Sequence, residues 1–182
     1  MARLVYQLKV TLRGTRPPIW RRLEVASDLT LGGLHEVLQI SMGWTDGHLH
    51  AFVADGVEYG TPDPEWGTQV RDESRVRLTR VLRAPKDRLV YEYDFGDGWE
   101  HVVVLEKVLP FDPARHQDPL VTGGRRACPP EDCGGVFGFY RMLDVLGDPQ
   151  HPEHGDMREW VGDVFEPDVF DIEEANLLLR GG

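Results

Sequence analysis

Residues 91–101 have the sequence YEYDFGDGWEH, and this segment indicates most clearly how the chain folds. Aromatic and acidic residues alternate from Tyr91 to Phe95, which is the two-residue period of a strand with one buried face. Gly96-Asp97-Gly98 supplies turn residues, and an apolar second strand follows over His101–Leu109. We therefore predict a β-hairpin over Arg88–Leu109.

The sequence before this hairpin predicts two strands, a helix and a further strand pair. The alternating segments Val5–Leu12 and Ile19–Val25 are joined by a Gly- and Pro-containing turn, which indicates a first hairpin. Apolar residues at helical spacing predict an amphipathic helix over Leu31–Met42. Short strands are expected at His48–Val53 and Val57–Tyr59. The order strand-strand-helix-strand resembles the start of a β-grasp arrangement.

The C-terminal part is expected to be mainly helical. Helices are predicted over Phe137–Leu146, Met157–Val164 and Ile172–Leu179, and the Pro- and Gly-containing segment Phe111–Arg126 is expected to be a long loop. At 182 residues the chain has the size of one domain. We predict a single α+β domain over residues 1–182, with a mixed β-sheet and a helical C-terminal part.

Composition and charge exclude several classes of protein. No apolar run approaches the roughly 18 residues of a membrane span, and the N-terminus lacks a signal-peptide core, so we expect a cytoplasmic protein without membrane contact. Two cysteines do not make a disulfide framework. The net charge is −11, with 13 acidic and 3 basic residues from Cys128 onward, which favours a protein partner over nucleic acid.

Several segments together are similar to a known family. They are Tyr91–His101 and, in chain order, PPIWRRLEV (Pro17–Val25), GWTDGHLHAF (Gly43–Phe52), ACPPEDCGGVFGF (Ala127–Phe139) and FEPDVFDIEEANLLL (Phe165–Leu179). The chain thus resembles the plasmid Ri open-reading-frame-three-like family, also labelled insertion-element passenger proteins. The resemblance implies a compact α+β domain of bacteria, often near mobile elements, and some members carry a resolvase label.

The resolvase label finds no support in the residues themselves. A serine recombinase needs a nucleophilic serine supported by several arginines. The chain has only Ser27, Ser41 and Ser74, which are expected at a helix cap, inside a helix and in a charged loop. No DNA-reading helix-turn-helix pattern follows them.

The tip of the second hairpin is a candidate binding site. Tyr91, Asp94, Asp97 and Trp99 stand within nine residues of one another, together with the carboxylate of Glu100. Carboxylates near a histidine can bind a metal or share a proton. The alternative is structural: the aspartates accept backbone N–H bonds in a tight turn, and Trp99 packs on the core.

A second candidate is a metal site made of histidine and cysteine. His48 and His50 face the same side if both lie on a strand, and Cys128 and Cys133 can lie on one knuckle. The four would make a Cys2His2 site for zinc, with His101 as a substitute ligand. The alternative is that the cysteines are buried, inert groups and the histidines are surface polar groups.

A third candidate is the basic first hairpin. Arg13, Arg16, Arg21 and Arg22 lie near Trp20 in this hairpin, and arginines interleaved with an aromatic residue suit contact with nucleic acid or with an acidic protein. The alternative is that these arginines pair with the acidic C-terminal region of the same molecule.

No complete catalytic constellation is evident, so whether the chain is an enzyme stays open at this point. The leading hypothesis is a non-catalytic binding or adaptor domain associated with mobile elements. The second is a metal-dependent hydrolase or nuclease with a His/Asp/Cys site. The second would use His48, His50, Asp94, Asp97 and His101. We expect a pocket with three walls, formed by Tyr91–His101, His48–His50 and Cys128–Cys133.

Overall fold

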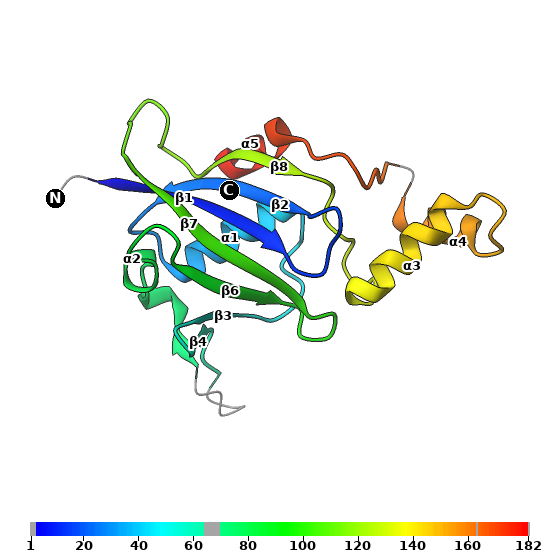
Figure 1. The fold of residues 1–182 in the computed structure, drawn as a ribbon, viewed down its shortest axis with the longest axis horizontal. Coiled ribbons are helices and arrows are strands. Elements are labelled where there is room, and N and C mark those ends of the chain that lie inside the picture. The colour runs from blue at the N-terminus through cyan, green and yellow to red at the C-terminus, as the bar shows by residue number, and fades with distance from the viewer. Residues whose placement is uncertain (1–2, 64–69, 163, 182) are drawn as a thin grey trace.

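The computed structural model describes residues 3–63, 70–162 and 164–181. Within these ranges the strands form one eight-stranded sheet in the order β5-β4-β3-β6-β7-β1-β2-β8 (Figure 1). All neighbouring strands are antiparallel except β4 and β5, which are parallel. The strands are β1 (Leu4–Leu12), β2 (Trp20–Ala26), β3 (His50–Ala54), β4 (Val57–Gly60), β5 (Arg71–Asp72), β6 (Arg88–Tyr93), β7 (Trp99–Pro110) and β8 (Leu120–Arg125).

Five α-helices and one 3-10 turn accompany the sheet in the described part of the chain. They are α1 (Leu31–Met42), the 3-10 turn η1 (Glu73–Arg75), α2 (Leu78–Val81), α3 (Gly135–Gly147), α4 (His154–Val161) and α5 (Ile172–Gly181). The predicted α+β class, with a mixed sheet, a strand-strand-helix-strand start and a helical C-terminal part, is confirmed.

Helix α1 carries the apolar face that the sequence predicts and ends where the sequence predicts. Thr30 caps its first turn by accepting a hydrogen bond from the backbone N–H of Gly33, and Gly43 ends it in a left-handed conformation. Leu31, Leu34 and Leu38 are fully buried against the sheet. Two polar side chains, His35 and Gln39, lie buried on this same apolar face, and they belong to a network described below.

The hairpin of β6 and β7 follows from the Tyr91–His101 segment. Tyr93 faces Trp99 at the end of the ladder, and Asp94 begins the turn with a positive φ of 55°. The Asp94 side chain satisfies the turn by accepting hydrogen bonds from the backbone N–H groups of Gly96 and Asp97. Trp99 is buried in the core, as the structural interpretation of this segment predicts.

One predicted loop is in part a strand. The prediction for Phe111–Arg126 was wrong over Leu120–Arg125, because this segment forms β8 along the free edge of β2. Its Gly123-Gly124 pair suggested a turn, but Gly124 lies flat against an aromatic ring. A Cβ at Gly124 would come within 2.3 Å of Phe170, so only glycine fits between this ring and the sheet.

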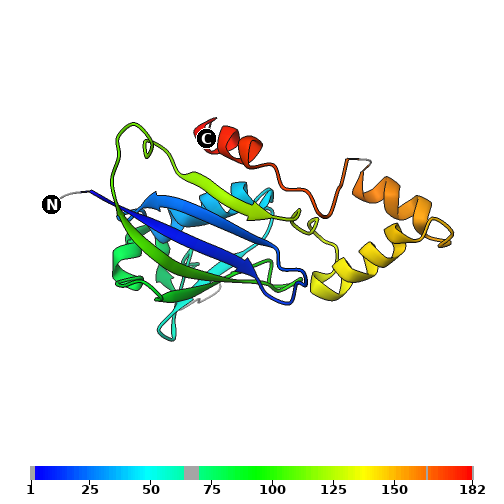
Figure 2. The same cartoon turned by 45° about the horizontal axis from the view of Figure 1, so that its top comes forward.

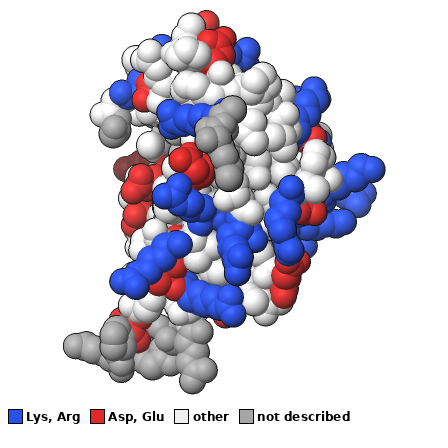
Figure 3. Space-filling model, turned by 90° about the vertical axis from the view of Figure 1, so that its left-hand side faces the viewer, with Lys and Arg blue, Asp and Glu red and all other residues white. Residues whose placement is uncertain are grey.

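Helices α3 and α4 project beyond the end of the sheet in both ribbon views (Figures 1 and 2). Helix α4 has no buried residue. Helix α5 returns to the body of the molecule beside β8, where the Asn176 amide donates to the carbonyl of Val121 and accepts from its N–H. The opposite end of the molecule carries many Lys and Arg side chains (Figure 3).

Candidate metal site

One histidine and three carboxylates meet at the end of the sheet near α3. His48 precedes β3, Asp94 follows β6, and Glu131 and Asp132 belong to the loop before α3. The Nε2 atom of His48 lies 3.2 Å from Asp132 Oδ1, 3.6 Å from Glu131 Oε2 and 3.7 Å from Asp94 Oδ2. Ligand atoms of His48, Asp94 and Asp132 all lie within 4.8 Å of one another, a spacing that could hold a metal ion.

Two of these carboxylates use one oxygen for structure and leave the other for the cluster. Asp94 Oδ1 accepts the two backbone bonds of the hairpin turn, while its Oδ2 faces His48. Glu131 Oε1 accepts from the Tyr93 hydroxyl at 3.0 Å and from the backbone N–H of Thr45 at 2.8 Å, while its Oε2 faces His48. The hydrogen bonds to Asp94 Oδ1 and Glu131 Oε1 thus fix the direction of Asp94 Oδ2 and Glu131 Oε2 toward His48.

Tyr93 is the residue that orients Glu131. Its hydroxyl accepts a hydrogen bond from the backbone N–H of Gly47 at 3.0 Å and donates its own proton to Glu131. Burial, with the nearby Glu131 carboxylate, raises the pKa of Tyr93 well above its usual range, so the hydroxyl stays protonated and donates.

The loop of Cys128–Gly135 contacts the turn between β6 and β7 and also Trp44, which follows α1. The Asp97 carboxylate accepts from the N–H of Gly134 at 3.1 Å, and the Trp44 indole donates to the carbonyl of Pro129 at 3.0 Å. A Cβ at Gly135 would lie 2.5 Å from the Asp97 carbonyl, so the close approach of the two backbones requires glycine. The three predicted walls therefore do come together, although the ligand atoms within them differ from those predicted.

His50 belongs to a separate, buried cluster. The strand begins only at His50, so the expectation that His48 and His50 share one strand face does not apply. The His50 ring stacks on His35 of α1 at 3.5 Å between ring centroids, with the planes 6° apart. Its Nε2 atom lies 2.9 and 3.0 Å from the two carboxylate oxygens of the buried Glu73.

His35 and Tyr91 are part of a closed ring of hydrogen bonds. The backbone N–H of Asp46 donates to Gln39 Oε1, so the Gln39 amide nitrogen must donate to the Tyr91 hydroxyl. Tyr91 then donates to His35 Nδ1, and His35 Nε2 donates to Asp46 Oδ1, each over 2.9 Å. The ring fixes a neutral His35, and burial together with the neighbouring His50 lowers the pKa of His35.

The sequence prediction missed six residues of the two clusters, namely His35, Gln39, Asp46, Glu73, Glu131 and Asp132. A usable signal was present for the first two, because a His and a Gln four residues apart on the apolar face of a helix must share a buried polar contact. The others lie in loops or in a short turn, where no periodicity marks a buried side chain.

The remaining predicted metal ligands do not belong to the described group of ligand atoms around His48. His101 is fully buried, donates through Nδ1 to the carbonyl of Tyr91, and has its pKa lowered to about 4 by burial. Cys128 and Cys133 are free thiols; burial raises the pKa of Cys133 to about 12 and that of Cys128 further. Among the residues that the structure describes, no group of three or more converging ligand atoms contains either thiol. The predicted ligands are thus divided between several places.

The two predicted arginines do not form an exposed basic face. Arg21 is 1% exposed, donates to the carbonyls of Ser41, Trp20 and Arg125, and packs its guanidinium 3.6 Å from the centre of the Phe170 ring. Burial lowers its pKa to about 10. Arg22 makes a two-bond ion pair with Glu106 of β7, not with the acidic C-terminal region.

Comparison with known proteins places these observations in a family context. The family model of plasmid pRiA4b ORF-3-like proteins matches residues 4–174. The chain is 40% identical to the uncharacterized protein y4hQ of Sinorhizobium fredii over 163 residues, covering 89% of this chain and 83% of that protein. The crystal structure of MM3350, a protein of unknown function from Methanosarcina mazei Go1, superposes with a TM-score of 0.86 at 36% identity, covering 96% of this chain and 98% of the other. In the described residues, no helix has the length and apolar character to cross a membrane.

Proposed function

We propose that this chain, which belongs to the plasmid pRiA4b ORF-3-like protein family, is a binding domain that holds a divalent metal ion at the His48 cluster. His48, Asp94 and Asp132 would be its ligands, with Glu131 as a fourth. The observation that carries the proposal is the orientation of the carboxylates. Asp94 and Glu131 each have one oxygen fixed by hydrogen bonds and the other turned toward His48.

The charge balance of the cluster supports the same conclusion. Three carboxylates that surround one imidazole repel one another unless a cation compensates for them. Within the described ranges, no Lys or Arg makes an ion pair with Asp94, Glu131 or Asp132. A divalent ion would supply the positive charge that no Lys or Arg of the described chain brings to these carboxylates.

The donor atoms favour a transition ion held by nitrogen and oxygen. One imidazole with two or three carboxylates suits Zn²⁺ or Mn²⁺, whereas a thiolate site would need the two buried cysteines. Zinc thus stays a candidate metal, with carboxylates in place of the thiolates that the sequence suggested.

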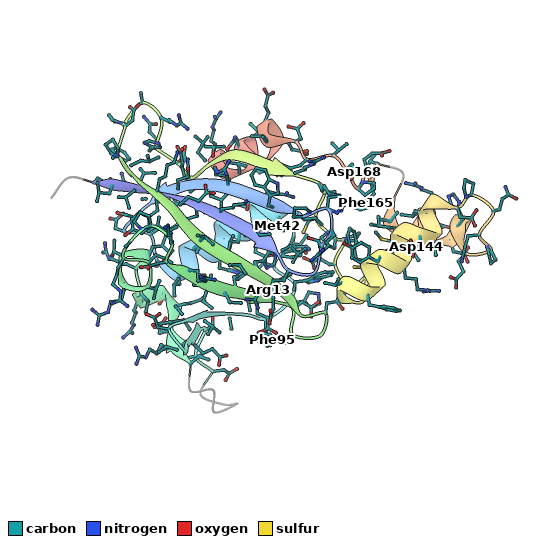
Figure 4. All side chains as sticks on the ribbon, viewed as in Figure 1. Arg13, Met42, Phe95, Asp144, Phe165 and Asp168 are labelled. Atoms are coloured by element: carbon teal, nitrogen blue, oxygen red, sulfur yellow. The ribbon has the colours of Figure 1, made fainter. Side chains whose placement is uncertain are left out.

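Metal titration of the full chain tests the proposal. Binding of Zn²⁺ and Mn²⁺ is measured by calorimetry on protein freed of metal with a chelator, for the native chain and for His48→Ala and Asp132→Asn. We expect both variants to weaken binding at least about tenfold, the loss that removal of an orienting residue alone produces. Asp144→Asn is the matched control, because Asp144 lies exposed on α3, away from the cluster (Figure 4). Equal affinity in all four proteins would overturn the proposal.

We further propose that the domain acts without chemistry of its own, as an adaptor for a protein partner. The arm formed by α3 and α4 supports this role, because Phe137 and Trp160 on it are 84% and 52% exposed. The family's name refers to a plasmid reading frame, which supports an association with mobile elements. Affinity capture with the native chain and with a Phe137→Ser, Trp160→Ser variant tests this role; a partner retained equally by both would contradict it.

A metal-dependent hydrolase or nuclease is the second candidate. The Asp132 side chain is 73% exposed, so a metal ion at this position would keep coordination sites open to water. Phosphodiester and ester substrates incubated with Mn²⁺ or Zn²⁺ test it. Turnover that disappears in Asp132→Asn would favour the hydrolase over the adaptor.

A further inference from the structure

One end of the molecule is basic, although the chain as a whole carries a net charge of −11 (Figure 3). Residues 75–88 contain six basic residues and one acidic residue, whereas residues 128–182 contain three basic and 13 acidic residues. The first of these segments forms α2 and the turn to β6, and it lies at the end opposite the α3–α4 arm (Figure 1). The two ends of the molecule therefore differ in the sign of their charge.

The turn between α2 and β6 exposes its cations and uses its carboxylate internally. Asp87 Oδ2 accepts hydrogen bonds from the backbone N–H groups of Arg83 and Ala84 at 2.7 and 2.9 Å. These bonds lower the pKa of the Asp87 carboxyl. The residues Arg83, Lys86 and Arg88 are exposed. The carboxylate of this turn thus holds the backbone in shape, and the basic side chains remain at the surface.

Lys86 has a backbone conformation that lysine rarely adopts. Its φ is 82°, in the left-handed region that favours glycine. The turn is fastened to β7, because the N–H of Lys86 donates to the carbonyl of Leu105 at 2.8 Å and the N–H of Leu105 donates to the carbonyl of Asp87 at 2.9 Å. Glycine would fit this conformation without strain. The ammonium group is therefore what a lysine adds at this position.

Lys86 lies between two surface cavities and belongs to the lining of both. The first has a volume of about 460 Å³ and includes Arg83 and Arg88, and the second has a volume of about 510 Å³ and includes Lys107. Residues 70–162 are described without a gap, so the walls from α2, β6 and β7 are continuous along the chain. The other described lining residues are Asp55, Val81 and Asp87 in the first cavity and Gln7, Arg22, Val104, Leu105 and Glu106 in the second.

The carboxylates of these linings have partners, whereas several of the cations do not. Asp55 and Glu106 each form an ion pair with an arginine, at 2.9 and 2.7 Å. Asp87 is engaged by the backbone of its own turn. Among the described residues, three cations of the two linings make no ion pair, namely Lys86, Arg88 and Lys107. Positive charge is therefore available on both sides of Lys86.

We propose that the basic surface formed by Arg83, Lys86, Arg88 and Lys107 binds a short acidic segment of a partner protein. Glu or Asp side chains of the segment occupy the two cavities, each beside an unpaired cation. A long polyanion fits less well, because the residues from 128 onward repel additional negative charge. A second copy of the chain fits less well because both copies carry a net charge of −11.

This inference rests on the proposed adaptor role, because an adaptor needs a second attachment surface besides the α3–α4 arm. The two surfaces can be tested separately, since they lie at opposite ends of the molecule (Figures 1 and 3). The Phe137→Ser, Trp160→Ser variant should bind an acidic peptide as tightly as the native chain. Such binding supports the basic surface even if capture of a partner by the arm fails, and its loss in this variant would contradict the inference.

Titration of the full chain with two peptides tests the proposal. Hexaglutamate and hexaglutamine, both with blocked ends, are added at neutral pH and low salt, and binding is followed by amide chemical shifts. We expect hexaglutamate to bind at concentrations on the order of 1 mM, with the largest shifts at Lys86 and Arg88, and hexaglutamine not to bind. The affinity for hexaglutamate should fall at least about threefold at ~0.15 M salt. Equal affinity for both peptides, or no binding of hexaglutamate at ~10 mM, would overturn the proposal.

Charge reversal locates the surface. Lys86→Glu and Arg88→Glu should each weaken hexaglutamate binding about fivefold. Arg180→Glu is the matched control, because it makes the same change of charge on exposed α5, beside β8 at the far edge of the sheet, and it should weaken binding less than about twofold. Equal losses in Lys86→Glu and Arg180→Glu would show that only net charge matters, and would overturn the proposal.

Lys86→Gly decides the question if charge reversal prevents folding. Glycine suits the left-handed conformation of residue 86, so the turn is kept while the ammonium group is removed. We expect hexaglutamate binding to weaken about threefold. Unchanged affinity in Lys86→Gly would remove the central cation from the proposed surface and contradict it.

Two other occupants are outcomes of the same set of proteins. A single-stranded DNA of about 20 nucleotides that binds more tightly than hexaglutamate, and loses affinity in Lys86→Glu, would assign the basic surface to nucleic acid. Self-association of the native chain in sedimentation, if it is lost in Lys86→Glu, would assign the surface to a second copy. Either result would overturn the proposal, and the absence of both supports an acidic segment of another protein.

Discussion

His48 and His50 are separated by one residue, yet they belong to clusters of opposite character. His48 faces three carboxylates at the surface. Among the described residues, Asp94 Oδ2 and Glu131 Oε2 accept no other hydrogen bond. His50 stacks on a neutral, buried His35 whose two nitrogens both have partners. The surface cluster therefore has carboxylate oxygens that could bind a ligand. In the inner network the polar groups of His35, Gln39 and Tyr91 bond to one another and hold the side chains in place.

Two tyrosines of β6 repeat this difference. Tyr91 closes the inner ring of hydrogen bonds, and Tyr93, two residues later, orients Glu131 of the surface cluster. One strand therefore supplies a structural hydroxyl and a site-orienting hydroxyl from residues of the same type. The two tyrosines differ only in the groups that their hydroxyls contact. The same Tyr→Phe substitution at each position can therefore be compared directly.

The largest effect is expected from acid, through the buried histidines. The native pKa of His101 is about 4, below the roughly 6.5 of an unfolded histidine, so the unfolded chain binds more protons between these values. The contribution of neutral His101 to the unfolding free energy is fully present above about pH 6.5. It is lost as the pH falls toward 4, and the total loss is roughly 3 kcal/mol. Urea unfolding at a series of pH values measures this loss.

The variant His101→Leu should flatten that pH dependence, because it removes the group that must remain neutral. His154→Gln, on the surface helix α4, should leave the slope unchanged. A slope that is the same in His101→Leu and the native chain would mean that His101 does not carry the acid sensitivity.

The next effect concerns the inner tyrosine. Tyr91→Phe leaves His35 Nδ1 and the Gln39 amide without their common partner, and we expect a loss of about 2 kcal/mol in unfolding free energy. The affinity for metal should not change. A variant that weakens metal binding without a loss of stability would reverse the roles assigned to the two clusters.

The outer tyrosine should give the converse result. Tyr93→Phe removes the donor that fixes Glu131 Oε1, and we expect metal affinity to fall about tenfold. Calorimetric titration with Zn²⁺ measures this, with Tyr91→Phe as the control. If both variants bind as tightly as the native chain, orientation of Glu131 is not part of the site.

The smallest effect is expected where an ion pair is open to water. Arg13 contacts Glu100, the neighbour of His101 on β7, at 2.6 Å, with both side chains about half exposed. Arg13→Gln should change the unfolding free energy by no more than about 0.5 kcal/mol. Thermal unfolding at two salt concentrations checks this. A loss above about 1 kcal/mol would show that this ion pair stabilises the fold more than its exposure to water predicts.

Much of the fold could be predicted because local patterns coincide with the final structure. The alternation from Tyr91 to Phe95, the turn at Gly96–Gly98 and the apolar face of Leu31–Met42 specify elements that tertiary contacts then keep. Strand β8 was missed because its two glycines fit beneath Phe170 and Trp20, a contact that depends on packing and not on local preference.

The sequence by itself determined the α+β class, the hairpins, the main helices and the three segments that form the candidate pocket. Only the tertiary structure decided which side chains within those segments converge. In the structure Glu131 and Asp132 face His48, whereas Cys128 and Cys133 on either side of them in the sequence do not join the cluster. His48 and His50 belong to different clusters. The physical reason is that local periodicity sets the direction of a side chain within its own element, whereas loop paths and docked backbones set its neighbours.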